Sequence, residues 1–521
     1  MEKSEPLVLA IDCGTQSLRA LIFAKDGQIL AQETLTYETP YLSPEPGYAE
    51  QNPEFYYQAL CQATRALKEK EPELFVRVEA LVLTGIRDSV LCLDSSMRPI
   101  TPCVLWLDER LAECKKPMPF LYRAGFAVAG MSECAAYSRE HSVCNWIQQN
   151  QPEIWAQTYK FIQISGYLIY RLTGVLADSI AAQIGHLPLN YKKKKWMSKW
   201  NIKYAVFNVP AEKFPALAMP GEVLGHITQQ ASRDSGLPAG LRLIAAGSDK
   251  GCEGLGSGCI DGSTASLSFG TTCTVQLTTE KYVEPQRFLP AYPAVLPGKY
   301  NPEIQIYRGF WMVTWFKEQF ARMETEAAEE FAGTAEQMLD ESLRFTPPGA
   351  DGLLVQPYWG PGLKTPEARG AMIGFHSGHT REHIYRAIIE GLCYALRDGL
   401  DEMSRRAGMR PEALTANGGG AKSDAVCQIA ADVFGLPVYR VQTHETSALG
   451  AAAVGFFGLG EYRSVEEAAR KMAHRKKAFL PDAKNHALYD EIYRQVYRGM
   501  YEKVRPMYRE MRGIYRARGK K

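Results

Sequence analysis

Hydrophobic positions along the chain form two patterns: short continuous apolar runs, and longer stretches in which apolar residues recur every three or four positions. The runs at 7–12, 18–23 and 241–248 are typical of strands, and the first two are close enough to pair as a hairpin. The run at 78–86 predicts a further buried strand, and the stretch 54–70 has helical spacing. Alternating strands and helices of these lengths predict an α/β fold.

A Gly-rich segment, residues 250–277, overlaps the start of a second unit that repeats the plan of the first. Each unit opens with a strand, a tight turn and a second strand. The two turns are Gly14-Thr15 and Gly270-Thr271. We therefore expect two domains, 1–256 and 257–521, that face one another across a central cleft.

Two other segments carry helical patterns. The stretch 143–174 predicts two helices, the second of which ends at Gly174. From about residue 461 to 521 the chain is basic and rich in tyrosine, and the spacing of its apolar residues predicts helix that packs on the second domain. A tail that binds a partner is the alternative for this segment.

The composition excludes some classes of function but does not identify one. The 521 residues are 46% hydrophobic and 23% charged, with a net charge of +2, so nothing in the overall balance points to nucleic acid. The 12 cysteines include no C-x-x-C pair, which is typical of a reducing compartment. The longest apolar stretch, 448–460, is shorter than the roughly 20 residues of a membrane span. We expect a cytoplasmic protein that does not bind a membrane or nucleic acid.

The first turn has the chemistry of a phosphate site. Gly14 permits close approach of backbone N–H groups to an anion, and Thr15 adds a hydroxyl donor. The carboxylate of Asp12 would repel a bare phosphate, so its presence indicates a hydrated Mg²⁺ between the two. An ordinary hairpin turn is the alternative, because Asp and Gly are common turn residues.

Two further features carry candidate chemistry. Asp249 follows a buried strand and precedes a Gly-rich segment, where a carboxylate is placed to accept a hydroxyl proton; a helix N-cap is the alternative role. Three glycines at 418–420 precede a helix that begins at Ser423 or Asp424 and leave room for a flat ring. The segment GGGAKS is not a Walker A loop, because Ala421 stands where that motif needs glycine.

These elements together resemble the FGGY carbohydrate kinases of the actin–hexokinase–Hsp70 superfold, over residues 7 to about 460. The stretches that carry the resemblance, in family order, are IDCGTQSLRALIF, GSDKGCEGLGSG, SFGTTCTV, GAMIGFHSGHTREHIYRAIIEGL, and NGGGAKSDAVCQIAADVFGLPV with ETSALGAAAVG. The resemblance implies two actin/hexokinase-like (ribonuclease H-like) domains. It also implies ATP-dependent transfer of a phosphoryl group to a hydroxyl of a small sugar, ketose or polyol.

The resemblance also implies roles for single residues. Asp249 would be the general base and contact the sugar, and Asp12 would position Mg²⁺ through water. The residues expected to bind the nucleotide and its phosphates are Asp12, Gly14, Thr15, Gln16, Ser17, Arg19, Gly270, Thr271, Thr272, Gly419, Gly420 and Ser423. The residues expected to contact the acceptor are Arg87, Asp88, Trp106 and Asp108.

One departure from the family pattern concerns the acceptor side. The family places a lysine three residues before a tryptophan, and here Val143 occupies that position, which weakens any sugar contact assigned through Tyr137. Segment 370–392 contains three histidines, which invite a metal site but which we interpret as part of a helix start. Segment 192–195 is a run of four lysines, which we interpret as a solvated loop.

The sequence leaves the acceptor undefined. Part of the first domain resembles xylulokinase, and another part faintly resembles glycerol kinase. A non-catalytic sensor of sugar or nucleotide on the same scaffold is the alternative function, and a homodimer is a possible assembly.

Overall fold

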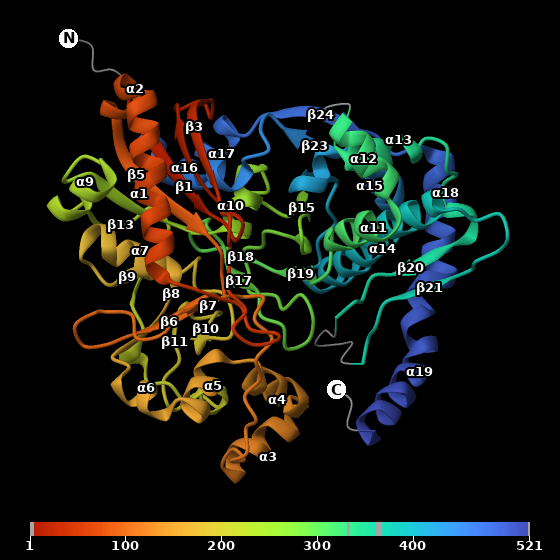
Figure 1. Ribbon diagram of the computed structural model, residues 1–521, viewed down its shortest axis with the longest axis horizontal. Helices are drawn as coiled ribbons and strands as arrows, with labels where there is room; N and C mark the ends of the chain where they lie inside the picture. Colours follow the sequence, from red (N-terminus) through yellow and green to blue (C-terminus); the bar gives the residue numbers. More distant parts are fainter. Residues whose placement is uncertain (1–4, 331–333, 361–366, 519–521) are drawn as a thin grey trace.

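Both predicted hairpins are present, and each opens one lobe of the molecule (Figure 1). In the computed structural model, β1 (Leu7–Cys13) pairs antiparallel with β2 (Ser17–Phe23), and β15 (Thr264–Phe269) pairs antiparallel with β16 (Cys273–Gln276). The structure describes residues 5–330, 334–360 and 367–518.

The two lobes are built on six-stranded sheets of the same topology. The first has the order β13-β14-β5-β1-β2-β3 and the second β24-β23-β22-β15-β16-β19. In the first sheet, β1, β2 and β3 are antiparallel neighbours, β5 and β14 run parallel to β1, and the edge strand β13 is antiparallel to β14. In the second sheet, β15, β16 and β19 are antiparallel neighbours, β22 and β23 run parallel to β15, and the edge strand β24 is antiparallel to β23. The remaining strands are β3 (Ile29–Thr36), β5 (Val78–Gly85), β13 (Val223–His226), β14 (Arg242–Ser248), β19 (Glu303–Ile306), β22 (Ala413–Asn417), β23 (Val438–Val441) and β24 (Arg475–Phe479).

Helices from both halves of the sequence cover the first sheet. One face packs against α1 (Pro53–Lys70) and α7 (Ile164–Thr173), and α7 ends at Gly174 with φ 73°, as predicted. The other face packs against α16 (Thr446–Gly458) and α17 (Val465–Met472), which come from the second half of the chain. A division at residue 256 therefore does not separate the two cores completely.

The helix α16 is apolar on every side because it is buried between the first sheet and α10 (Asp249–Gly256). A Cβ at Gly450 would lie 1.9 Å from the carbonyl oxygen of Cys252, so only glycine permits the observed approach of these two helices. Among the helices of the described residues, none combines the length and the hydropathy needed to cross a bilayer.

The second sheet is covered by α14 (Arg381–Ala407) and α15 (Asp424–Phe434). The predicted helical tail packs here through buried tyrosines of α18 (Ala483–Ile492) and the π-helical turn η4 (Tyr493–Tyr497); α19 (Arg498–Ala517) continues beyond them along the edge of the lobe (Figure 1). The tail is not helical throughout, because β24 pairs with β23, and its first helix, α17, packs on the first lobe instead of the second.

A smaller subdomain extends the first lobe. It contains a four-stranded sheet of order β4-β7-β6-β8 and several short helices. The two helices predicted over 143–174 are wrong in number: α5 (Val143–Asn150), α6 (Pro152–Gln157) and α7 are interrupted by the strand β8 (Lys160–Gln163). Pro152 begins a new helix, and the apolar run after it pairs with β6 instead of continuing the helix. The other members are β4 (Glu50–Gln51), β6 (Val90–Leu93), β7 (Cys103–Val104), α3 (Phe120–Val128), α4 (Ser132–Glu140) and α8 (Tyr204–Phe207).

Candidate active site

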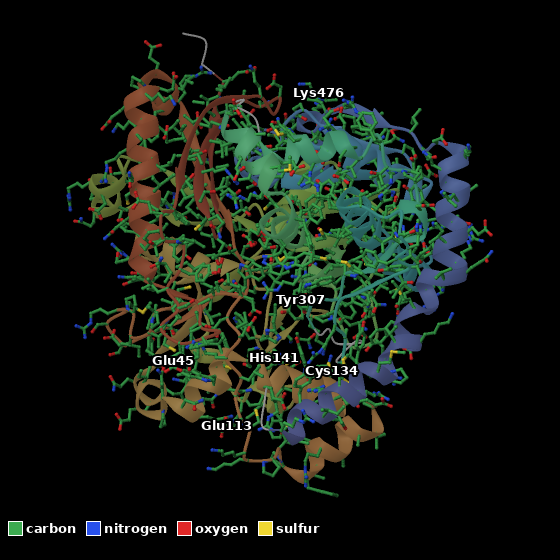
Figure 2. The ribbon with its side chains drawn as sticks, turned by 45° about the vertical axis from the view of Figure 1, so that its right-hand side comes forward. Glu45, Glu113, Cys134, His141, Tyr307 and Lys476 are labelled. Atoms are coloured by element: carbon green, nitrogen blue, oxygen red, sulfur yellow. The ribbon has the colours of Figure 1, made fainter. Side chains whose placement is uncertain are left out.

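Residues of both lobes line one cavity of about 820 Å³. Most of the residues predicted from the sequence lie on its wall: Gly14, Thr15, Arg87, Asp88, Trp106, Asp108, Asp249, Gly270, Thr271 and Thr272. Figure 2 shows His141 and Cys134 of the first lobe below Tyr307 of the second, and all three residues line the same cavity. The two Gly-Thr turns therefore open into a common space.

The first turn is closed by its own backbone. The N–H of Gly14 donates to the carbonyl oxygen of Ser17 at 3.0 Å, and a Cβ at Gly14 would stand only 3.0 Å from that oxygen. The indole Nε1–H of Trp106 donates to the hydroxyl of Thr15 at 3.0 Å. Trp106 thus fixes the orientation of the threonine hydroxyl, while the exposed side chain of Gln16 and the buried Ser17 are absent from the cavity wall.

Asp249 is the first residue of α10 and faces the cavity, while its neighbour Ser248 takes the capping role. The hydroxyl of Ser248 accepts the N–H of Gly251 at 3.3 Å, so the alternative role of Asp249 as the N-cap is wrong. One oxygen of Asp249 accepts the N–H of Lys250 at 2.7 Å. The carboxylate lies at the C-terminal end of β14, where it can accept a proton from a bound hydroxyl.

Asp12 lies in a cluster of three acidic side chains and one arginine. Asp12 is 6% exposed, and Arg19 Nη1 donates to its carboxylate at 3.2 Å. Burial raises the pKa of Asp12 to about 7; the Arg19 guanidinium opposes this shift, and Asp249 and Glu445 add to it. Arg19 also lies 3.6 Å from Glu445. Mg²⁺ prefers oxygen ligands, and here three carboxylates face a single arginine, so the residues present fit the ion.

Lys250 was not predicted, although it is adjacent to Asp249. Its ammonium group donates to the Ser268 hydroxyl at 2.6 Å and lies 3.2 Å from both oxygens of Glu253. Burial would lower the pKa of Lys250, but Glu253 and Asp249 raise it above its ordinary value. A protonated lysine therefore joins α10 to β15 at the edge of the second turn.

A buried ion pair crosses between the lobes. Arg87, just beyond β5, donates to the two oxygens of Glu303 on β19 at 2.5 and 3.3 Å. The side chains are 13% and 3% exposed. Burial would lower the pKa of Arg87, but Glu303 raises it, so the guanidinium stays charged. Sequence reasoning found Arg87 but not its partner, which is more than 200 positions away.

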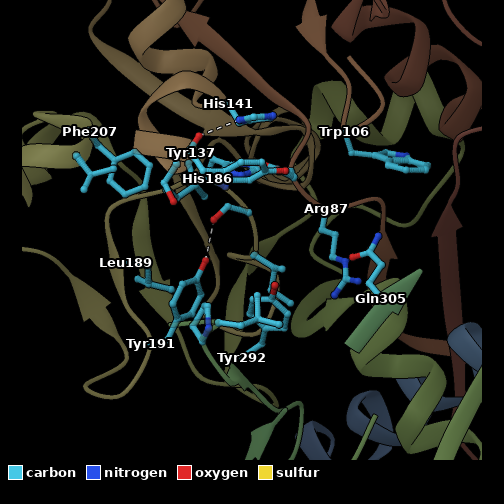
Figure 3. A pocket seen from close by; sticks show the side chains of 18 of the residues that line it. Arg87, Trp106, Tyr137, His141, His186, Leu189, Tyr191, Phe207, Tyr292 and Gln305 are labelled. Atoms are coloured by element: carbon cyan, nitrogen blue, oxygen red, sulfur yellow. Dashed lines mark hydrogen bonds and ion pairs between the residues drawn. The ribbon is translucent and has the colours of Figure 1, made fainter. Parts of the chain in front are cut away.

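Histidines and a tyrosine line the middle of the cavity (Figure 3). His186 Nδ1 lies 2.8 Å from Asp88, which has φ 52°, in the left-handed region. Burial would raise the pKa of Asp88, but His186 lowers it. Tyr137 stacks on His141 with 3.8 Å between ring centroids. Tyr137 is thus on the wall even though Val143 replaces the family lysine.

Asp108 has its carboxylate engaged within the first lobe. Its oxygens accept hydrogen bonds from the Arg110 guanidinium at 2.7 Å and from the N–H of Ala49 at 2.7 Å. Because these bonds use both oxygens, its carboxylate holds the cavity wall in place, although the residue itself borders the cavity.

The glycine-rich loop at 418–420 lies behind the second turn and outside the 820 Å³ cavity. A Cβ at Gly418 would stand 2.9 Å from the carbonyl of Phe269, and one at Gly420 would stand 2.3 Å from the Phe310 ring. A Cβ at Gly419 would meet no atom of the described residues within 4 Å, which leaves space beside it. The hydroxyl of Ser423 accepts the N–H of Val426 at 3.2 Å and begins α15.

The predicted helix start at Thr380 is confirmed, and the histidines before it meet Asp351. The Nε2 atoms of His376 and His379 lie 3.0 and 3.2 Å from oxygens of Asp351. Their Nδ1 atoms accept backbone N–H groups at 3.0 and 2.9 Å. A metal-bound histidine normally donates a hydrogen bond from its other ring nitrogen, so this pattern disfavours a metal site.

Comparison with known proteins gives matches along nearly the whole chain. The N-terminal domain of the FGGY family of carbohydrate kinases matches residues 7–256, and its C-terminal domain matches 265–459. A xylulose kinase of Lactococcus lactis is 27% identical over 502 residues, 95% of this chain and 96% of its own. A gluconokinase of Bacillus subtilis is 24% identical over 471 residues, 88% and 89% of the two chains.

The fold has a solved counterpart. The structure of a ligand-bound xylulose kinase from Lactobacillus acidophilus superposes with a TM-score of 0.79 at 22% identity, covering 98% of this chain and 99% of the other. The two lobes therefore have the actin/hexokinase-like architecture, as expected.

Proposed function

Because the chain belongs to the FGGY family of carbohydrate kinases, we propose that it uses this cavity to transfer the γ-phosphoryl group of ATP to a hydroxyl of a small sugar or polyol. The observation that carries the proposal is the common space shared by Asp249, the two Gly-Thr turns and Arg87. The relatives are a xylulose kinase and a gluconokinase, which suggests open-chain or ketose acceptors.

In the proposed reaction, Asp249 takes the proton of the acceptor hydroxyl. The hydroxyl oxygen forms a bond to the γ-phosphorus as the bond between that phosphorus and the β,γ-bridging oxygen breaks, and ADP leaves. The transition state of such a transfer is loose, so positioning and charge stabilisation supply most of the catalysis. The hydroxyls of Thr15 and Thr271, with backbone N–H groups of the two turns other than that of Gly14, would hold the phosphates.

Lobe closure would exclude water, which otherwise competes with the acceptor for the phosphoryl group. The Arg87–Glu303 pair supports this role because it joins the lobes beside the cavity. Mg²⁺, held by Asp12 through water, would neutralise phosphate charge. Gly419, Gly420 and Ser423 would bind the adenosine, and Arg19 would keep Asp12 oriented.

The test is ADP release measured with D-xylulose, D-gluconate, glycerol, pentitols and hexitols, with mass spectrometry of the product. Acceptor-dependent ADP release with a phosphorylated product is expected. Binding of acceptors without turnover would favour a sensor, and ADP release that is independent of every acceptor would contradict the proposal.

Three further assignments belong to the proposal. We infer domains at 1–256 and 257–521 with a C-terminal extension from about 461, and a cytoplasmic location, which suits ATP use and the 12 unpaired cysteines. A homodimer is proposed as the assembly. Light scattering coupled to size exclusion tests the dimer, and a mass of about 58.1 kDa would contradict it.

A further inference from the structure

The cavity extends well past the groups that would perform phosphoryl transfer. Its volume of about 820 Å³ is near the upper end of the roughly 300–1,000 Å³ that encloses drug-sized ligands. Figure 3 shows Trp106 and Arg87 on one side and Phe207 and Leu189 on the other, with Tyr137 and His186 between them. The reaction end and the far end are therefore different regions of one space.

The far end is apolar, and it is made by the small subdomain of the first lobe. Phe126 of α3 and Val206 and Phe207 of α8 line it, and all three belong to the hydrophobic core of that subdomain. Ile202, 39% exposed, lies just before α8 on the same wall. The cavity thus borders one side of a hydrophobic core. We call this region the far chamber and define it by Phe126, Ile202, Val206, Phe207, Phe288 and Leu289.

The second lobe closes the far chamber. The carbonyl of Phe288 lies 3.9 Å from Sγ of Cys134, and Arg287 donates to the carbonyl of Ala129 at 3.2 Å. Phe288 has φ 72°, which is an uncommon and strained conformation for an aromatic residue. Its N–H donates to Glu284 at 2.9 Å, which helps to hold the strained loop. Strain of this kind is retained where surrounding contacts fix it, and here those contacts lie across the lobes.

The charges at the rim of the far chamber are opposite in sign. Lys203 and Glu284 both line the cavity, and both lie near Cys134. Burial is the main cause that raises the pKa of the Cys134 thiol; the charge of Lys203 lowers this pKa and the charge of Glu284 raises it. Neither sign dominates, so the rim does not select an anionic or a cationic group. The apolar wall is the feature that distinguishes this end.

We propose that the preferred acceptor is a sugar or polyol that carries an alkyl or aryl substituent, with its reacting hydroxyl toward Asp249 and its substituent in the far chamber. The inference rests on the proposed function of the same cavity. The rings of Tyr137, His141 and His186 then lie beside the polar part of the acceptor, between the reaction end and the substituent (Figure 3).

The test uses acceptors that differ only in the substituent. Glycerol ethers and ribosides carrying methyl, n-butyl, phenyl or 3-carboxypropyl groups are compared with glycerol, D-xylulose and D-gluconate, and kcat/KM is measured for each. A fully buried methylene multiplies kcat/KM by about fourfold, so the three additional methylenes of the n-butyl compound can raise it by up to about sixtyfold. With partial burial, the n-butyl compound should exceed the methyl compound by about tenfold to sixtyfold. A ratio near one, or a better rate with the carboxypropyl compound, would overturn the proposal.

Two variants place a charge in the far chamber. Ile202→Asp changes a half-exposed side chain. Phe288 has φ 72°, and Phe288→Asp introduces a residue that tolerates this left-handed backbone conformation. Each should reduce the n-butyl to methyl ratio to about one. The matched control is Ile373→Asp, which changes an isoleucine of 40% exposure on β21 (Ala371–Ile373), outside the cavity, and should keep the wild-type ratio.

The outcomes separate the two proposals. If no acceptor of either set stimulates ADP release, the proposed kinase function fails. If the unsubstituted acceptors are phosphorylated and the butyl and phenyl compounds gain nothing, only the far-chamber proposal fails. Retention of the ratio in both aspartate variants would also contradict it.

Discussion

Replacing Asp12 with asparagine should change how the stability of the metal-free protein depends on pH. Asp12 is 6% exposed, and burial raises the pKa of its carboxyl from an ordinary value of 3.8 to about 7. Between these two values the folded state binds more protons than the unfolded state. The free energy of unfolding of the wild type therefore falls as the pH rises through this window and stays at its lower value above it.

The size of the effect follows from the shift. Each pKa unit corresponds to about 1.4 kcal/mol, so the three units or so from 3.8 to about 7 give an upper value of about 4 kcal/mol. Asparagine does not titrate here and avoids this loss. The attraction of Arg19 is already included in the pKa of about 7, because the guanidinium opposes the shift, so the ion pair needs no separate subtraction. Near pH 4 the folded carboxyl is protonated, and Asp12→Asn should match the wild type in stability there. Near pH 8 the variant should be more stable by up to about 4 kcal/mol.

Thermal unfolding followed by fluorescence between pH 4.5 and 8.5, in the presence of a chelator, measures this difference. At about 2–4 °C per kcal/mol for a unit of 150–250 residues, the gap in Tm should grow by several degrees across the range. Asp26→Asn, at an exposed position, is the control and should track the wild type. Addition of Mg²⁺ and ADP should narrow the gap. A Tm difference that does not change with pH would refute the reasoning.

Three other substitutions test the cavity. Asp249→Asn should lower kcat by about 10²–10⁴-fold with little change in Tm, because it removes the proposed base, and a wild-type rate on a confirmed acceptor would exclude that role. Trp106→Phe removes the donor to Thr15, so kcat/KM for ATP should fall roughly two- to tenfold in steady-state assays, and unchanged kinetics would contradict it. Arg87→Met leaves Glu303 buried without its partner and should destabilise the protein by about 3–5 kcal/mol in denaturant titration. The Arg87→Met/Glu303→Leu double variant should recover most of this loss, and failure to recover would argue against the pair.

Signals that act over a few residues were sufficient for much of the fold. The two Gly-Thr hairpins, the helix end at Gly174 and the helix start at Thr380 all depend on neighbouring residues, and the structure has each of them. The strand β8 was missed because its apolar run also fits a helix, and pairing with β6, some 70 positions earlier, decides between them.

The acceptor side of the site was only partly predictable for a related reason. Thr15 and Asp249 stand at recognisable ends of strands, whereas the partners of Arg87 and Asp88 are Glu303 and His186, far away in the sequence. No local pattern identifies such pairs, because tertiary packing alone brings them together. The packing of α16 on the first sheet escaped prediction for the same reason, since an apolar helix is equally compatible with either lobe.

The shared topology of the two sheets places different residues at equivalent strand ends. The strands β5 and β14 of the first sheet correspond in position to β22 and β23 of the second, and the carboxyl ends of parallel strands meet at one edge of a sheet. In the first lobe these ends lead to Arg87 and Asp249, which are charged and face the cavity. In the second, β22 leads to the glycines at 418–420, of which Gly418 and Gly420 pack closely against Phe269 and Phe310 and Gly419 has open space beside it. In the proposed function, the first lobe would supply the group that acts on a hydroxyl, and the second would supply a surface suited to a flat nucleotide ring.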